Sequence, residues 1–443
     1  MTESPGASRT LGLGSATALV VGHTIAVGIF LTPAELIGAL ASPALTLGMW
    51  LSCGVLIFAG ALTFGELAAR YPRAGGPYVY LREGWGERVA FLYGWQSALI
   101  MDPGVTAALA SGLAAYLVVL WPGAAGSEKL LGIATIWTVT VLAMAGLKLS
   151  ARTLGVLTAL KLLAVAAIVG AAFTIGDGSW SNLVPFTGRR AGAPPVTEAL
   201  ALGLVGAFFS FGGFWEASRV AGEIRNPGRT LPLALALGVT CVTGVYVLTS
   251  LAFMYLVPVE HTTSAAELAR RAGEAVLGPV GPAVFALVVV LSVAASALAL
   301  VMMAPRVYVA MSRDGLFPSA LAAVRPGTST PARAMLLLGT LASVFVLVGT
   351  FQQIVAFFIC TALSFIALAA AALFVVRRRA PDETPFKAPG YPVGPALFVL
   401  LTMAVVLLVL MARPVEALAG AVIVLLGLPA RRVLLRTSGV ENR

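Results

Sequence analysis

The chain has 443 residues, of which 59% are hydrophobic and only 11% are charged, and its mean hydropathy of +0.95 lies outside the range of soluble globular proteins. The net charge of +10 does not indicate a nucleic-acid partner, because the basic residues stand between long apolar runs, where they set membrane topology. The three cysteines lie inside apolar runs, so we expect neither a disulfide framework nor a metal site or other cofactor.

Apolar runs of about 20 residues, the length needed to cross a bilayer, recur along the whole chain. We count twelve and therefore predict an all-α integral membrane protein with about twelve transmembrane helices. In chain order the predicted spans cover residues 11–40, 44–69, 88–120, 130–147, 153–175, 199–222, 233–257, 281–311, 334–350, 353–376, 394–411 and 415–434.

The Lys and Arg residues between these spans are unevenly divided. If the N-terminus is cytoplasmic, 20 of the 29 lie in cytoplasmic segments and six lie in external ones. Positive residues are retained on the cytoplasmic side of a membrane. We therefore predict a multi-pass protein of the cell (inner or plasma) membrane, surrounded by the lipid bilayer, with both termini cytoplasmic.

The first ten spans can be laid over each other as two units of five, and each unit opens with a span that contains glycines near its centre. This arrangement predicts an inverted-repeat transporter with the last two spans as an appendage. The external stretch 258–278 is expected to form a surface helix. The predicted division is 1–10 as a cytoplasmic tail, 11–175 as the first repeat, 176–198 as an external loop, 199–376 as the second repeat, 377–393 as a cytoplasmic loop and 394–443 as spans eleven and twelve with a cytoplasmic tail.

Glycines interrupt the first and the sixth predicted spans. The first contains GHTIAVGIF at residues 22–30, and the sixth contains the glycine pair of SFGGFWEASRVAGEIRNPGRTLP at residues 210–232. Inside hydrocarbon an unwound backbone survives only where it lines a protected cavity or is held by neighbouring helices. Glycines also serve in close helix crossings. Two breaks at matching positions of two halves favour a binding site at the membrane midplane.

A broken helix offers N–H groups with a partial positive charge on one side and carbonyls with a partial negative charge on the other. This pair of charges suits a zwitterion. We expect amides around Gly28 to bind a carboxylate and carbonyls near Ser210 to bind an ammonium group. The predicted substrate site comprises Ile25, Ala26, Val27, Gly28, Ile29, Phe209, Ser210, Phe211, Gly212, Gly213 and Phe214.

Four motifs carry a family resemblance. They are GHTIAVGIF followed by Thr32-Pro33, GELAARYPRAGGPYVYLREGWG at 65–86, GEIRNPGRTLP at 222–232 and SRDGLFP at 312–318. In this order they resemble the amino acid–polyamine–organocation (APC) superfamily, and most closely its amino acid permeases and L-type amino acid transporters. The likeness covers residues 10–380.

The resemblance implies the APC fold of five plus five inverted helices, alternating access and an amino acid held by its α-amino and α-carboxyl groups. Relatives read Gly-Ser-Gly-Ile-Phe or Gly-Ala-Gly-Ile-Phe where this chain has Ala26 to Phe30, so its carboxylate pocket is more crowded. Many relatives place a carboxylate where this chain has Trp215, which favours a neutral L-amino acid over a cationic one. Phe209 and Phe211 align with positions that gate or line the pocket.

Lys161 lies about halfway along the fifth predicted span, where a charge costs several kcal/mol unless it is paired or neutralised. It is too deep to reach the interface easily. It resembles the lysine that sodium-independent relatives carry there, whose amine stands in for the second sodium ion of sodium-coupled ones. We predict a coupling role through loss and gain of its proton, with Ser292 and Ser296 as polar neighbours.

Three further ionisable residues are candidates with open roles. Asp102 is expected to touch substrate, relay a proton or fill the hydrogen-bonding gap that Pro103 creates. Glu216, together with Arg219 on the inner half of the sixth span, is typical of an inward gate or a structural ion pair. His23 precedes the first break, where a packed, hydrogen-bonding role competes with that of a proton switch.

The sequence therefore predicts secondary active transport or exchange of amino acids, sodium-independent, with proton coupling left open. A polyamine or organic amine transporter of the same fold is the alternative, and a sensor or channel with this fold is the rival of a different class. The major facilitator class also has twelve spans, but ELAARYPRAGGPY replaces its signature between spans two and three. An enzyme is not predicted, because we find no clustered ligands and no nucleophile with a base.

Overall fold

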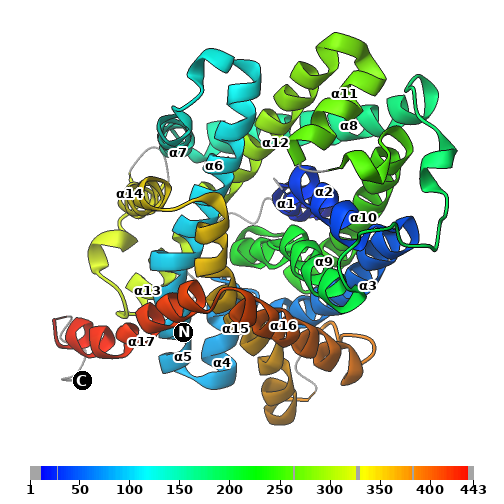
Figure 1. Cartoon of the computed structure of the whole chain (residues 1–443). Helices are drawn as coiled ribbons and strands as arrows, with labels where there is room; N and C mark the ends of the chain where they lie inside the picture. Colours follow the sequence, from blue (N-terminus) through cyan, green and yellow to red (C-terminus); the bar gives the residue numbers. More distant parts are fainter. Residues whose placement is uncertain (1–10, 27, 263–264, 326–329, 382–383, 438–443) are drawn as a thin grey trace.

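The chain folds into a bundle of helices in the computed structural model, which describes residues 11–26, 28–262, 265–325, 330–381 and 384–437 (Figure 1). Within these residues the regular elements are helices, and two isolated β-bridges lie outside the helices. The longer helices are α1 (Leu13–Thr24), α2 (Gly28–Leu40), α3 (Pro43–Arg70), α4 (Pro77–Trp85), α5 (Glu87–Gln96), α6 (Asp102–Leu120), α7 (Glu128–Met144), α8 (Leu147–Thr174), α9 (Val196–Phe211), α10 (Pro227–Leu256), α11 (Ala265–Leu277), α12 (Gly281–Met303), α13 (Pro305–Arg313), α14 (Ala332–Val348), α15 (Phe351–Arg379), α16 (Val393–Ala412) and α17 (Pro414–Thr437).

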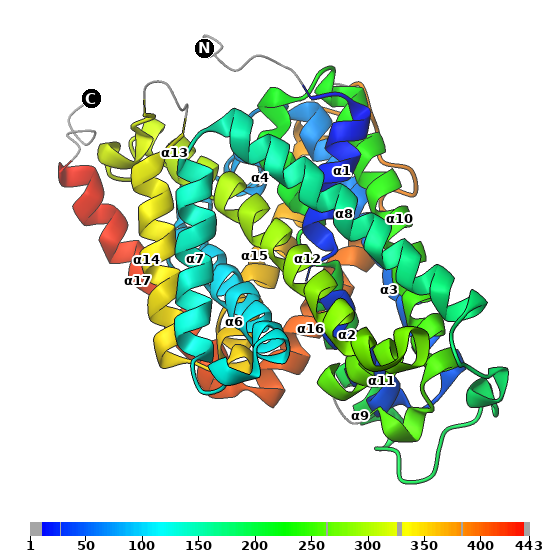
Figure 2. The same cartoon turned by 90° about the horizontal axis from the view of Figure 1, so that it is seen from above.

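Among the described residues, nine helical stretches are long and apolar enough to cross a bilayer. The broken pair α1–α2 and the 17-residue helices α7 and α14 bring the number of crossing elements to twelve. The prediction of an all-α membrane protein with about twelve spans is confirmed. The crossing helices run roughly from top to bottom in Figure 2, with α4 and α13 near the upper end and α11 near the lower one. We call these the α4 end and the α11 end.

Equivalent helices of the two halves pack against each other. In the broken elements, α1 contacts η4 (Phe214–Glu223) and α2 contacts α9, so the two elements run antiparallel. Helix α3 likewise packs on α10, α6 on α12, and α7 on α14. Pairing of the first four elements with the sixth to the ninth, in order, is consistent with an inverted repeat. The residue boundaries of the repeats and loops stay a prediction.

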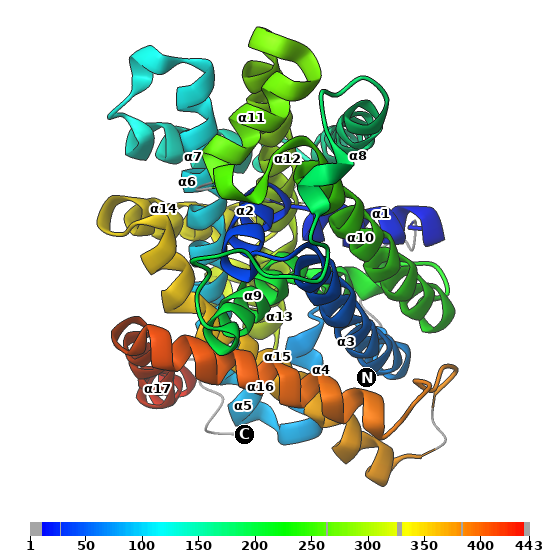
Figure 3. The ribbon, with the colours of Figure 1, turned by 45° about the vertical axis from the view of Figure 1, so that its right-hand side comes forward.

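The α3–α10 contact, visible in Figure 3, depends on small residues. A Cβ atom added at Gly54 would lie 2.5 Å from Thr243, and one added at Gly65 would lie 2.9 Å from the Pro232 backbone. Close approach through small residues is the usual way in which membrane helices gain packing energy, because lipid is as apolar as their side chains. The same figure shows α16 and α17 along the outer side of the bundle.

One helix was not expected from the sequence. The segment between the second and third spans contains α4, which packs against α15 and η4. Tyr78 and Arg82 on this helix both donate hydrogen bonds to Asp314 Oδ2, at 2.7 Å each. Burial, followed by the hydrogen bond to the Asp314 carboxylate, raises the pKa of the Tyr78 phenol. Helix α4 therefore closes one end of the bundle rather than forming an open loop.

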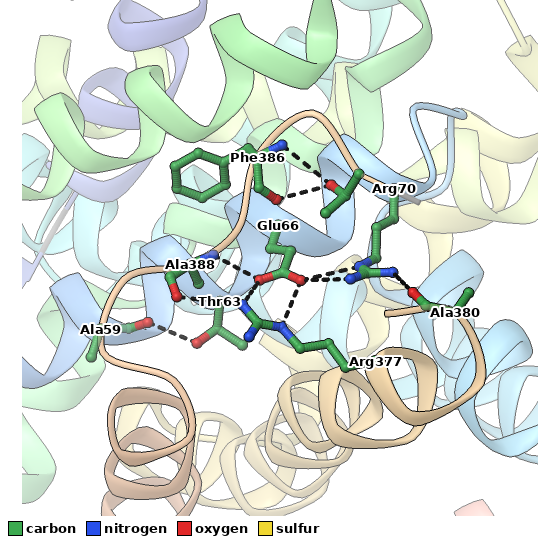
Figure 4. Close-up of polar contacts among 9 residues, drawn as sticks. Ala59, Thr63, Glu66, Arg70, Arg377, Ala380, Phe386 and Ala388 are labelled. Atoms are coloured by element: carbon green, nitrogen blue, oxygen red, sulfur yellow. Dashed lines mark hydrogen bonds and ion pairs between the residues drawn. The ribbon is translucent and has the colours of Figure 1, made fainter. Parts of the chain in front are cut away.

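A buried carboxylate ties three parts of the chain together near the α4 end (Figure 4). Glu66 on α3 is fully buried and accepts hydrogen bonds from Arg70, from Arg377 at the end of α15, and from the Ala388 N–H at 2.7 Å. Because every partner is a charged group or a backbone N–H, the negative charge is well compensated. We call Glu66, Arg70, Arg377 and Ala388 the Glu66 cluster.

Candidate substrate site

The first break lies between α1 and α2. Helix α1 ends at Thr24, the Ala26 N–H turns back to the Thr24 carbonyl at 2.8 Å, and α2 begins at Gly28. Val27, which the sequence placed in the carboxylate site, lies outside the described residues. The first N–H groups of a helix have no partner within the helix. The start of α2 therefore presents amides with a partial positive charge at the centre of the bundle.

The second break follows α9, which ends at Phe211. Gly213 has a φ of +96°, a left-handed conformation that favours glycine, and η4 continues as a tight 3₁₀ helix. A Cβ atom at Gly213 would lie only 2.5 Å from Cδ2 of His23. Glycine at position 213 is thus required both by the backbone turn and by the neighbouring broken helix.

The two breaks meet each other. A Cβ atom at Gly28 would lie 2.8 Å from the Ser210 hydroxyl oxygen, which itself donates to the Thr32 hydroxyl at 2.8 Å. The Tyr246 hydroxyl, on α10, lies 2.6 Å from the Ser210 carbonyl oxygen and 3.1 Å from the Thr24 carbonyl oxygen. Tyr246 thereby joins the ends of α1 and α9, and nothing in the local sequence singled it out.

Lys161 caps the end of α1 from the side. Its ammonium nitrogen lies 2.5 Å from the carbonyl oxygens of both Gly22 and Ile25, and it donates to the Ser296 hydroxyl at 3.0 Å. The side chain is 1% exposed. The last carbonyls of a helix carry a partial negative charge, which a cation stabilises. Of the two predicted polar neighbours, Ser296 contacts Lys161, whereas the buried Ser292 hydroxyl has no hydrogen-bond partner among the residues that the structure describes.

A second buried charge cluster lies beside the break in the sixth span. Arg219 on η4 is fully buried; its Nη1 lies 3.2 Å from Asp102 Oδ1 and its Nε lies 2.7 Å from Glu216 Oε2. Asp102 also accepts from the hydroxyls of Ser97 and Tyr308, at 2.7 and 2.9 Å. We call Asp102, Arg219 and Glu216 the Arg219 triad.

The triad links α6 to η4, and the Tyr308 hydroxyl bonded to Asp102 adds α13. Asp102 begins α6 directly after a π-helical turn at Ser97–Met101, whereas Tyr308 lies on α13. Such π turns often occur at functional sites. Of the roles left open for Asp102, the geometry supports contact with the cavity and closure of a hydrogen-bonding network. Arg219 is an internal ion-pair residue rather than a surface one.

A cavity of about 90 Å³ lies between the two breaks and the α6, α12 and α15 helices. Ten of the residues that the sequence singled out line this cavity, and they include substrate, coupling and ionisable candidates. They are His23, Ala26, Gly28, Asp102, Phe209, Ser210, Gly212, Gly213, Glu216 and Ser296.

Other predicted residues lie behind the wall. The side chains of Ile25, Ile29, Phe211 and Phe214 are packed in the hydrophobic core, so only their backbone could reach a ligand. The wall opposite the breaks is apolar and was not anticipated, because an apolar residue on a membrane helix carries no local sign of facing a cavity. Its larger side chains are Val105, Leu109, Leu300, Phe358, Ile359 and Leu363.

Comparison with known proteins matches residues 11–427 to the family described as amino acid permease. The cystine/glutamate transporter of Pongo abelii is 30% identical over 431 residues, which cover 95% of this chain and 84% of that protein. The b(0,+)-type amino acid transporter 1 of Mus musculus is 29% identical, with coverage of 92% and 83%. The serine/threonine exchanger SteT of Bacillus subtilis (strain 168) is 27% identical, with coverage of 89% and 90%. With a family match over nearly the whole chain and two broken helices facing one cavity, this chain belongs to the amino acid permease family.

Proposed function

We propose that this chain is a secondary active transporter of amino acids that works by alternating access. The observation that carries the proposal is the meeting of two breaks of opposite polarity over one cavity. The α-carboxylate binds at the first amides of α2, near Gly28, and the α-ammonium binds at the carbonyl end of α9, near Ser210. The relatives named above are transporters or exchangers of amino acids, which supports the same class of cargo here.

We further propose that transport does not require sodium. The Lys161 ammonium binds the carbonyls at the end of α1. Without this ammonium, the same carbonyls would suit a metal cation. The protonated amine of Lys161 at this point removes the need for a bound metal cation. Proton exchange at Lys161 is the proposed route by which transport would respond to pH.

Alternating access needs one end of the cavity to be closed at a time. The Arg219 triad joins η4 to α6, and the Arg306–Glu223 pair at 2.8 Å joins α13 to the end of η4. Both lie between the cavity and the α4 end, which we propose is cytoplasmic. Opening toward that side would separate these pairs. The proposed moving units are the repeats 11–175 and 199–376.

Counterflow in vesicles tests the proposal. The purified full chain is placed in liposomes loaded with an unlabelled neutral amino acid mixture, and uptake of the labelled amino acids is followed with sodium replaced by choline. We expect transient accumulation that depends on the internal load and is the same without sodium. Flux that ignores the internal load would indicate a channel. Uptake of a diamine without any amino acid uptake would indicate an amine carrier.

A further inference from the structure

The cavity wall carries negative but no positive side chains among the residues that the structure describes. Its ionisable lining groups are His23, Asp102 and Glu216. The two neighbouring cations, Lys161 and Arg219, lie behind the wall, where backbone carbonyls bind the first and the carboxylates of the triad pair with the second. A substrate therefore meets carboxylate oxygens and aromatic rings, and not an ammonium or a guanidinium group.

The size of the cavity sets a second limit. An apolar cavity of about 150 Å³ in another protein holds benzene, and pockets for drug-sized ligands measure about 300–1,000 Å³. The 90 Å³ here is smaller than either. Phe358, Ile359 and Leu300 are among the apolar residues that line this cavity, so a substrate side chain shares this small volume with the α-amino and α-carboxyl groups.

We propose that the substrates are the smallest neutral amino acids, glycine, alanine and serine, and that amino acids with an acidic side chain are rejected. This inference rests on the proposed function and narrows its substrate class. Size is limited by the apolar wall of α12 and α15, with Ile359 as one determinant. Charge is selected by Glu216 and Asp102, since the two carboxylates of the Arg219 triad outnumber its one arginine and a second substrate carboxylate would meet this excess negative charge in a site of low dielectric. A serine hydroxyl, in contrast, can donate to either carboxylate.

Thermal shifts of the purified full chain give apparent affinities for the probes glycine, L-alanine, L-serine, L-leucine, L-phenylalanine and L-lysine. We expect alanine and serine to bind about tenfold or more tightly than the three larger amino acids. Tighter binding of any of those three would overturn the size limit and leave the proposed function standing. Binding of none of the probes would overturn both proposals.

Two variant pairs test the determinants. Ile359→Ala should strengthen leucine binding relative to alanine binding, whereas the control Ile366→Ala, two turns along the same helix and buried in the core, should leave that ratio unchanged. An equal ratio of leucine affinity to alanine affinity in both variants would show that Ile359 does not determine the size limit.

For charge, L-threonine is compared with aminomalonate, which has the same number of non-hydrogen atoms and an extra carboxylate. The wild type should prefer threonine. Glu216→Gln should reduce that preference, whereas Glu87→Gln, at the start of α5 and paired with Arg431 away from the cavity, should retain it. Wild-type binding of aminomalonate as tight as that of threonine would overturn the charge limit.

Discussion

At the scale of single residues, Lys161 explains how α1 can end inside a bilayer. A helix end in hydrocarbon leaves carbonyls without partners, which costs several kcal/mol for each group. The ammonium of Lys161 accounts for two of these carbonyls, and the Tyr246 hydroxyl accounts for the Thr24 carbonyl. The buried charge is thus balanced by the helix end that it caps.

We predict that Lys161→Ala lowers the transport rate about tenfold or more and removes its response to pH, because hydrogen bonds to a charged group contribute about 1.5–3 kcal/mol each. The measurement is vesicle uptake across a range of pH. Lys129→Ala is the matched control, because Lys129 is exposed and donates to the Leu347 carbonyl, away from the cavity. Unchanged, equally pH-responsive uptake in the Lys161 variant would remove this residue from the mechanism.

At the scale of elements, the break between α9 and η4 depends on a backbone that only glycine adopts without strain. The positive φ of Gly213 coincides with the point at which the sixth element lies closest to His23 of the first. One residue therefore decides both the direction of η4 and the spacing of the two broken elements.

Replacement of Gly213 with leucine should weaken amino acid binding about tenfold or more, since a left-handed φ is strained for other residues by about 1–3 kcal/mol and the added side chain meets His23. Binding is followed by the thermal shift with the amino acid that stabilises the wild type most. Gly244→Leu on α10 is the control, because a Cβ atom there meets nothing within 4 Å. Normal affinity in the Gly213 variant would count against the proposed pocket.

At the scale of the whole molecule, the Glu66 cluster connects α3, the end of α15 and the segment that leads to α16. It does so at the α4 end, on the same side of the cavity as the Arg219 triad. The cluster differs from surface ion pairs such as Arg73–Glu83, because its carboxylate is fully buried. Removal of the Glu66 carboxylate would leave the positive charges of Arg70 and Arg377 without the negative charge that balances them.

Glu66→Ala should reduce the free energy of unfolding by about 3–5 kcal/mol, as expected when one partner of a buried ion pair is removed. Glu83→Ala, which breaks the exposed pair, should cost about 0–1 kcal/mol. Denaturant or thermal unfolding in detergent compares the two variants with the wild type. Equal stabilities for Glu66→Ala and Glu83→Ala would mean that the cluster does not hold these segments together.

Several features of the fold follow from local properties and could be predicted from the sequence. Hydropathy and length determine the crossing helices, and Thr350 with Gln353 forms the cap at which α15 begins. The glycines of the two breaks can be read from the sequence, because their effect is on the conformation of their own backbone. Lys161 is conspicuous because a charge within an apolar run is rare.

Other features were decided only by the tertiary structure, because they pair residues that are far apart in the chain. Tyr246 reaches two breaks that lie in different halves, and Arg219 pairs with Asp102 across 117 positions. Helix α4 is short, and it packs against α15 and η4. By itself the sequence determined the membrane class, the broken helices and the buried lysine, whereas the charge and volume of the cavity arise only when six helices from both halves are brought together.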